Sequence, residues 1–155
     1  MTGAQRVLVA ALAIASACAP APQTSNTPAA GTVMPASIVD PYLKIQSALA
    51  SDSVEGVKAN AGEIATAASA LGAPAMKIST ASLQLASAAE LEDARTKFGV
   101  LSEAIDTYMT GLHLTPPAGV KVAYCPMVQK PWLQQADTIA NPYYGAQMLT
   151  CGSFR

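Results

Sequence analysis

Apolar residues recur at helical spacing through the middle of the chain, and this periodicity is the strongest constraint on its fold. Glycine, proline and short polar runs divide the pattern into separate stretches. These stretches cover residues 41–50, 54–71, 78–87 and 91–112. Their spacing is that of amphipathic helices, and the short connections between them favour antiparallel neighbours. We therefore predict an all-α fold, an up-and-down four-helix bundle with an irregular C-terminal tail packed on it.

Local signals predict where these helices begin and which residues fill the core. Asp40 before Pro41 is typical of a helix start, since the acidic side chain can cap the first turn and proline fits there. Asp52, followed three residues later by Glu55, predicts a capping box for the second helix. Alanine dominates the apolar stripes, so the larger side chains should supply most of the burial energy. In the last stretch these are Leu91, Phe98, Leu101 and Ile105.

The N-terminus predicts export. Arg6 precedes an apolar run at residues 7–17, which is shorter than the roughly 20 residues that span a bilayer. A positive residue, a short apolar run and the small-residue ending Ala15-Ser16-Ala17 are together typical of a signal peptide. We expect residues 1–17 to be removed by cleavage after Ala17.

Cys18 comes directly after this site. Small residues before a cysteine favour lipoprotein processing, with lipid attached to Cys18. The same ending also suits ordinary secretion, in which Cys18 would have no special role. Lipidation would leave Cys125 and Cys151 as an even pair. Ala19, in place of aspartate, is compatible with outer-membrane sorting. We therefore predict a periplasmic protein that a lipid anchors to the outer membrane.

The rest of the chain divides into a tether and one domain. Residues 18–37 are rich in alanine, proline, serine and threonine and carry no charge, a composition typical of a disordered linker. Residues 38–155 have the length of a single domain. A domain of this length can bury a core without help from a metal ion or a disulfide.

Charge and composition exclude several classes of function. The formal net charge is −1 and the sequence contains no basic patch, which argues against nucleic acid as a partner. The chain has a single histidine and no glycine-rich phosphate loop. No pair of nucleophile and base can be named, so we predict that the protein is not an enzyme.

The tail after residue 117 is different in character. Residues 120–124 alternate and predict a short extended segment, and Asn141-Pro142 favours a turn. Four sulfur-containing side chains occur in this tail, at Cys125, Met127, Met148 and Cys151. In an exported protein two cysteines usually form a disulfide, which on the chain-entropy model would contribute about 3 kcal/mol. The methionines would then be core fillers.

The same four sulfurs also suit a soft metal ion, because thiolate and thioether ligands select Cu(I) over hard cations. The spacings are Cys125-x-Met127 and Met148-x-x-Cys151, so that each segment offers two sulfurs. Zinc is less suited, since the chain offers few further ligands of the kind zinc prefers. From the residues alone a disulfide, a metal site and a pair that alternates between the two all stay open.

Two further residues are candidate contacts for such an ion. The ring of Trp132 could cover a bound monovalent cation through its face. His113 could join as a nitrogen ligand, although its place near a helix end is more typical of a solvated residue.

Three stretches of the sequence form a longer pattern. They are DPYLKIQSALASD, ARTKFGVLSEAI and a closing motif with the order YCPM, WLQ, NPYYG, ML and CG. This pattern resembles a bacterial domain family of unassigned function. That family occurs as free-standing exported proteins and as the C-terminal domain of periplasmic adaptor subunits of heavy-metal efflux pumps of the copper/silver type. The resemblance covers nearly all of residues 38–152 and implies a helical bundle with a tail motif in a copper-handling setting. The motif falls on Cys125, Pro126, Met127, Trp132, Asn141, Pro142, Tyr143, Gly145, Met148 and Cys151.

Two hypotheses of function follow. In the first, the protein binds a soft metal ion, Cu(I) above all, through Cys125, Met127, Met148 and Cys151, and holds it or passes it to an efflux-pump partner. In the second, it is a structural or interaction lipoprotein with a Cys125–Cys151 disulfide. A cell-envelope partner would then dock on an aromatic face, because exposed aromatic residues often carry binding energy. That face would consist of Trp132, Tyr143 and Tyr144.

Overall fold

The computed structural model describes residues 33–155. The expected signal peptide, Cys18 and most of the expected tether lie outside the described residues. The folded part begins before residue 38, where the sequence predicts the domain to start. Met34 is buried, and its N–H donates to the carbonyl of Thr115 at 2.9 Å. Val33 and Thr115 form an isolated β-bridge, so the start of the first helix is tied to the segment that follows the last one.

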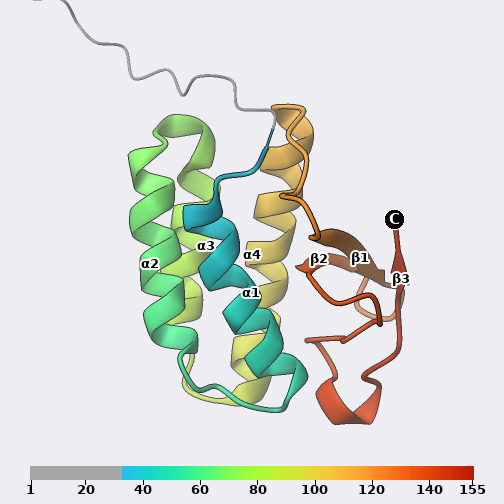
Figure 1. Cartoon of the computed structure of the whole chain (residues 1–155). Coiled ribbons are helices and arrows are strands. Elements are labelled where there is room, and N and C mark those ends of the chain that lie inside the picture. The colour runs from blue at the N-terminus through green and yellow to red at the C-terminus, as the bar shows by residue number, and fades with distance from the viewer. Residues whose placement is uncertain (1–32) are drawn as a thin grey trace, which may run out of the picture.

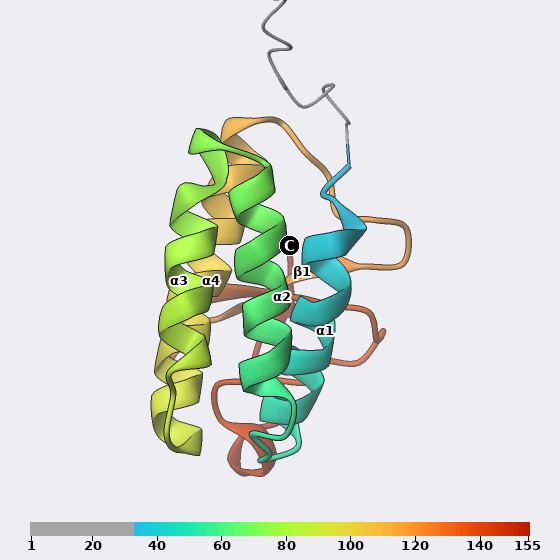
Figure 2. The same ribbon diagram turned by 90° about the vertical axis from the view of Figure 1, so that its left-hand side faces the viewer.

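Within the described part, four α-helices form one side of the molecule (Figure 1). They are α1 (Ala36–Ala50), α2 (Val57–Ala70), α3 (Met76–Ala86) and α4 (Leu91–Gly111), and a short 3₁₀ turn, η1 (Ala73–Ala75), leads into α3. In sequence order, each helix packs on the next, whereas α1 and α4 contact each other little. Figure 2 shows the helices from their outer side, with the strands behind them. No helix in residues 33–155 is both long and apolar enough to cross a membrane.

The four helical stretches are confirmed, but two of the predicted helix starts are wrong. Helix α1 begins one turn early, because the Pro35 carbonyl accepts hydrogen bonds from the N–H groups of Ile38 and Val39, at 3.0 and 3.1 Å. Pro41 therefore lies inside the helix. Asp52 caps no helix: α2 begins after Gly56, without a side-chain cap. Asp52 contacts the tail of the chain instead, as described below.

The prediction of an all-α fold is wrong, because the tail forms a three-stranded antiparallel sheet. The strands are β1 (Lys121–Cys125), β2 (Lys130–Gln134) and β3 (Ser153–Phe154), in the order β2-β1-β3. The molecule is therefore a mixed helix-and-sheet fold. The extended segment predicted at residues 120–124 corresponds to β1, whereas β2 and β3 had no counterpart in the prediction.

Strand β2 packs against both α4 and α1, on the side of the helical layer where the sheet lies, and so completes the core (Figure 1). Trp132 on this strand is 1% exposed. At this edge of the sheet, two buried tyrosine hydroxyls bind the main chain of β2. The hydroxyl of Tyr42 accepts a hydrogen bond from the N–H of Leu133 at 3.3 Å, and that of Tyr143 donates to the carbonyl of Pro131. The sheet edge is thereby occupied by side chains from within the protein, which protects it from pairing with another chain.

One hydrophobic core joins the helices and the sheet. The predicted core residues Phe98, Leu101 and Ile105 are buried in it, and Leu91 is partly buried. Phe98 stacks against Tyr42, with ring centroids 4.8 Å apart. Burial raises the pKa of Tyr42 well above its ordinary value, so its hydroxyl stays protonated and can donate to Ser102, 2.6 Å away.

Candidate sulfur site

Cys125 is the last residue of β1 and belongs to the core. The strand alternates, so that Ala123 and Cys125 are buried while Tyr124 is only partly covered. Cys125 is 0% exposed, and it accepts a hydrogen bond at its sulfur from the side-chain nitrogen of Asn141, at 3.3 Å. The first of the predicted sulfur ligands is therefore an interior residue with one polar neighbour.

Met127 lies outside this interior. It belongs to the turn of residues 126–129 that connects β1 to β2, and its side chain is 63% exposed. Gln129 closes the turn with a φ of 56°. Although Met127 is only two residues from Cys125, the two side chains lie in different environments, one at the surface and one in the core.

Asn141 organises the loop that leads from β2 to Cys151. It is 0% exposed. Its Oδ1 accepts from the N–H of Tyr143 at 2.8 Å, which closes an Asx turn. Its Nδ2 donates both to Cys125 Sγ and, at 2.7 Å, to the carbonyl of Cys151. One amide group therefore touches both cysteine residues.

Cys151 is partly buried and lies just before β3. Its N–H donates to the carbonyl of Met148 at 3.0 Å, which makes a turn of the predicted Met148-x-x-Cys151 unit. In the β1–β3 pairing Tyr124 faces Ser153. The next position along β1 is Cys125, and the next along the tail is Gly152, adjacent to Cys151. Strand pairing and Asn141 therefore bring both cysteines to the same end of the sheet. No disulfide joins them in the described part of the chain.

Asp52 and Arg95 form an ion pair, and each of them also hydrogen-bonds to the loop. Asp52 follows α1, and Arg95 lies on α4 and is buried. Arg95 also donates to the carbonyls of Leu49 and Pro142, at 3.0 and 3.1 Å. Asp52 accepts from the N–H of Ala146 at 3.2 Å. The hydrogen bond from Arg95 lowers the pKa of Asp52, helped by the one from Ala146.

Two of the three aromatic residues predicted as docking anchors lie inside the protein. The indole Nε1 of Trp132 donates to Gln134 Oε1 at 2.9 Å, and its ring meets that of Tyr143 edge-on, with centroids 5.9 Å apart. Both side chains are buried, and burial raises the pKa of Tyr143. Tyr144 is the only one of the three that is partly exposed. Trp132 and Tyr143 are core residues, so they cannot form the docking face.

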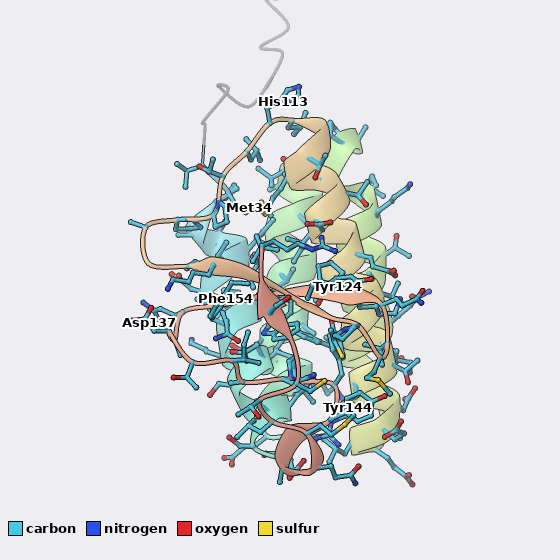
Figure 3. The ribbon with its side chains drawn as sticks, turned by 90° about the vertical axis from the view of Figure 1, so that its right-hand side faces the viewer. Met34, His113, Tyr124, Asp137, Tyr144 and Phe154 are labelled. Atoms are coloured by element: carbon cyan, nitrogen blue, oxygen red, sulfur yellow. The ribbon has the colours of Figure 1, made fainter. Side chains whose placement is uncertain are left out.

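His113 is far from the sulfur residues. It is exposed, adopts a positive φ of 54° after the end of α4, and lies at the top of the molecule in Figure 3. Tyr144, in the loop that contains Asn141, lies at the bottom of the same view. The structure therefore does not place His113 as a ligand beside the cysteines, and its solvated position agrees with the more usual role of a residue at a helix end.

The site is thus a pair of cysteines around one buried amide, with Met148 three residues before Cys151 and linked to it by a turn. No group of three or more histidine, cysteine, aspartate or glutamate side chains in residues 33–155 could hold a metal ion. The amide of Asn141 touches the sulfur of Cys125 and the backbone carbonyl of Cys151. Cysteine sulfur as a ligand suits a soft ion rather than a hard cation. The nearby hollow between α1 and the tail, about 530 Å³, includes Leu149 in its lining but neither cysteine.

Sequence reasoning missed three residues that shape this site. Asn141 was interpreted only as part of a turn, although an asparagine buried between two cysteines can bind both. Asp52 was interpreted as a cap. Arg95 lies three residues before Phe98, within the apolar stripe of α4. A charged residue at such a position signals a buried partner, and that signal could have been used.

No protein-family model, no curated protein and no solved structure matches this chain. The family resemblance carried by the three sequence stretches therefore stays a prediction.

Proposed function

We propose that this protein is an exported, lipid-anchored protein of the cell envelope that binds a soft metal ion, Cu(I), through Cys125 and Cys151. The observation that carries the proposal is the contact of one amide nitrogen, Asn141 Nδ2, with the sulfur of Cys125 and the carbonyl of Cys151. Two cysteines held on one residue can supply two thiolates to one ion, and thiolates prefer Cu(I).

The ligand set differs from the four sulfurs that the sequence suggests. Cys125 and Cys151 are the central pair, and Met148 is the third candidate because the turn links it to Cys151. Met127 points to solvent from the hairpin turn, which makes it suited to meeting an incoming ion rather than to enclosing a bound one. Trp132 packs in the core beneath this region and supports the fold.

The biological role that fits such a site is to hold copper in the envelope or to pass it to an efflux partner. In this proposal residues 1–17 are the signal peptide that directs export, and Cys18 is the residue that carries the lipid. The proposal includes no catalytic step, since the residues around the cysteines offer no base beside a nucleophile.

A competition titration with a chromophoric Cu(I) chelator tests this function. The chain is used with Cys18→Ser, reduced and without oxygen, so that Cys125 and Cys151 are its only thiols. We expect one Cu(I) per chain, and loss of that binding in the Cys125→Ser, Cys151→Ser variant. Met76→Leu is the matched control, because Met76 is an exposed methionine on α3. Equal competition by the parent chain and by the double cysteine variant would contradict the proposal.

A second candidate function is a structural or interaction protein in which Cys125 and Cys151 form a disulfide. The burial of Cys125 at the β1–β3 junction favours it, because a bond there would fasten a strand of two residues to the sheet. Counting free thiols in the Cys18→Ser chain taken from the periplasm and denatured without reductant separates the two. Two free thiols exclude the disulfide, and none supports it.

A further inference from the structure

We infer that Asn141 is the positioning residue that makes Cys125 and Cys151 a single ligand set. This inference rests on the copper-binding function proposed above. It assigns a role to a residue that is not itself a ligand, and that role is to hold one cysteine by its sulfur and the other by its backbone.

Every polar group of Asn141 has a partner, and the partners come from both sides of the site. The main-chain N–H donates to the Leu149 carbonyl at 2.7 Å, and the main-chain carbonyl accepts from the N–H of Gly145 at 3.1 Å. The side-chain oxygen accepts from Tyr143, and the side-chain nitrogen donates to the two cysteines. The backbone and Oδ1 contacts shape the loop, whereas the Nδ2 contacts reach the cysteines.

The division between Oδ1 and Nδ2 separates a folding role from a ligand role. Oδ1 closes the turn at Tyr143 and is needed whether or not a metal ion binds. Nδ2 points its N–H groups at Cys125 Sγ and at the carbonyl of Cys151. A cysteine binds a metal ion as a thiolate, and an N–H donor stabilises negative charge on an acceptor atom. Outer groups of this kind orient the ligands of metal sites and tune them.

Gly152 explains how Cys151 can lie so close to Asn141. Its φ of 145° is one that side-chain-bearing residues rarely adopt, and a Cβ atom there would lie 2.6 Å from Trp132 Cη2 and 3.0 Å from the carbonyl oxygen of Tyr124. The chain can therefore pass tightly over the indole only with glycine at this position. This tight passage sets Cys151 next to Asn141, and the amide then fixes its carbonyl.

Asn141→Asp tests the inference, because aspartate keeps an oxygen for the N–H of Tyr143 but has no N–H for the cysteines. Its carboxyl group would also lie beside the sulfur of Cys125, where it would disfavour negative charge on that sulfur. We expect the affinity for Cu(I) to fall by about 10–100-fold, the usual effect of removing such a neighbour. The chelator titration described above measures it, in the same Cys18→Ser chain.

Tyr42→Phe is the control for a loss of stability alone. It removes the buried hydroxyl that binds Ser102 and Leu133 and leaves the cysteines and Asn141 unchanged. We expect its affinity for Cu(I) to stay within about twofold of the parent chain. An equal loss of affinity in both variants, or no loss in Asn141→Asp, would overturn the inference. If the parent chain itself binds no Cu(I), the proposed function fails instead.

If Asn141→Asp does not fold, the inference can still be tested on the chain that keeps Asn141. In ¹⁵N-labelled protein the side-chain NH₂ signals of Asn141 report directly on the two donated hydrogen bonds. We expect these signals to shift when one equivalent of Cu(I) is added. The shift should exceed that of the NH₂ signals of Asn60 on α2, whose side-chain nitrogen donates to the carbonyl of Gly56. Unchanged Asn141 signals in a chain that has bound Cu(I) would overturn the inference.

Discussion

At the scale of single residues, Gly145 is where the tail loop meets the helices. Its φ is +52°, and a Cβ atom at this position would overlap the carboxylate of Asp52 and the guanidinium of Arg95. Glycine is therefore required both by the backbone conformation and by the space that the ion pair occupies. The loop that holds Asn141 and Met148 depends on this close approach.

Gly145→Ala should destabilise the protein strongly. The backbone conformation alone costs a residue with a side chain about 1–3 kcal/mol, and the overlap with Asp52 and Arg95 adds to it. Gly62→Ala is the matched control, since Gly62 is helical and a Cβ there meets nothing within 4 Å. It should stabilise by about 0.5–1 kcal/mol. Urea unfolding of both variants measures the difference, and a Gly145→Ala variant as stable as the parent would contradict this account.

The ion pair of Asp52 with Arg95 makes stability depend on pH. The folded-state pKa of Asp52 is lowered by the hydrogen bond from Arg95, so its contribution is present above the unfolded pKa of about 4. That contribution is lost as pH falls through the lower pKa of the folded state. We expect the free energy of unfolding to decrease as pH falls below about 4, and Asp52→Asn to show a weaker decrease over this range.

The matched control for Asp52 is Asp93→Asn. Asp93 pairs with Lys97 one turn along α4, at 2.8 Å, and both side chains are partly exposed. The hydrogen bond from Lys97 also lowers the pKa of Asp93, but Lys97 is more exposed than Arg95 and an exposed pair contributes little. The decrease of stability in acid should therefore change much less in Asp93→Asn than in Asp52→Asn. Denaturant titrations from neutral to acidic pH provide the comparison. Parallel curves for Asp52→Asn and the parent chain would show that the pair does not couple the loop to the helices.

These residues also show what sequence reasoning can and cannot reach. The pattern Asp52-x-x-Glu55 predicts a cap, because capping boxes are local and recur. The actual partner, Arg95, lies 43 positions further along the chain. No local rule connects the two, so the ion pair emerges only where the end of α1, helix α4 and the tail loop meet.

At the scale of elements, two tyrosines hold β2 where it packs against α4 and α1. Tyr42 and Tyr143 bind its main chain from the helices and from the loop. Pro131 has no N–H to give to a neighbouring strand. The element is thus stabilised by side chains as much as by pairing with β1.

Tyr42→Phe should destabilise the protein while leaving its secondary structure unchanged. The variant keeps the ring that packs on Phe98, but it leaves Ser102 and the N–H of Leu133 without their buried partner. An unsatisfied buried group costs about 1–3 kcal/mol. Chemical denaturation with far-UV circular dichroism checks both parts. If the free energy of unfolding does not fall measurably, groups other than the Tyr42 hydroxyl must bind the edge of β2.

The helices and β1 could be predicted, whereas β2 and β3 could not, for a physical reason. Helix α4 carries its own periodic signal over 21 residues. In contrast, β2 is short, contains Pro131 and is buried at successive positions, so alternation does not reveal it. Strand β3 has two residues and exists only because β1 is available to pair with it. Strand pairing is a contact between distant segments, and such contacts leave little trace in local sequence.

At the scale of the whole molecule, the tail covers one side of the helical layer (Figure 1). It also contains Cys125 and Cys151. The sequence proposes Cys125, Met127, Met148 and Cys151 as the ligands of one site, with Trp132 and His113 as further contacts. In the structure Asn141 touches both cysteine residues, whereas Met127 and His113 are exposed and Trp132 is buried in the core. Asn141 and Gly152 support both the cysteine pair and the packing of the tail. Binding of an ion by Cys125 and Cys151 should therefore stabilise the entire domain.

Cu(I) should therefore raise the thermal unfolding midpoint of the parent chain. A ligand that binds only the folded state at 100 times its Kd adds about 2.7 kcal/mol. The Cys125→Ser, Cys151→Ser variant should show no such rise under the same reducing conditions. Scanning calorimetry with and without one equivalent of Cu(I) gives the comparison. An equal rise in both chains would place the copper elsewhere.

The most direct test of the central claim is the native mass of the Cys18→Ser chain after one equivalent of Cu(I) is added to reduced protein without oxygen. The account predicts one copper per chain, retained in the presence of a competing chelator and lost in the Cys125→Ser, Cys151→Ser variant. A chain that stays free of copper, with a mass lower by two hydrogens once air is admitted, would contradict it. Cys125 and Cys151 would then be a structural disulfide.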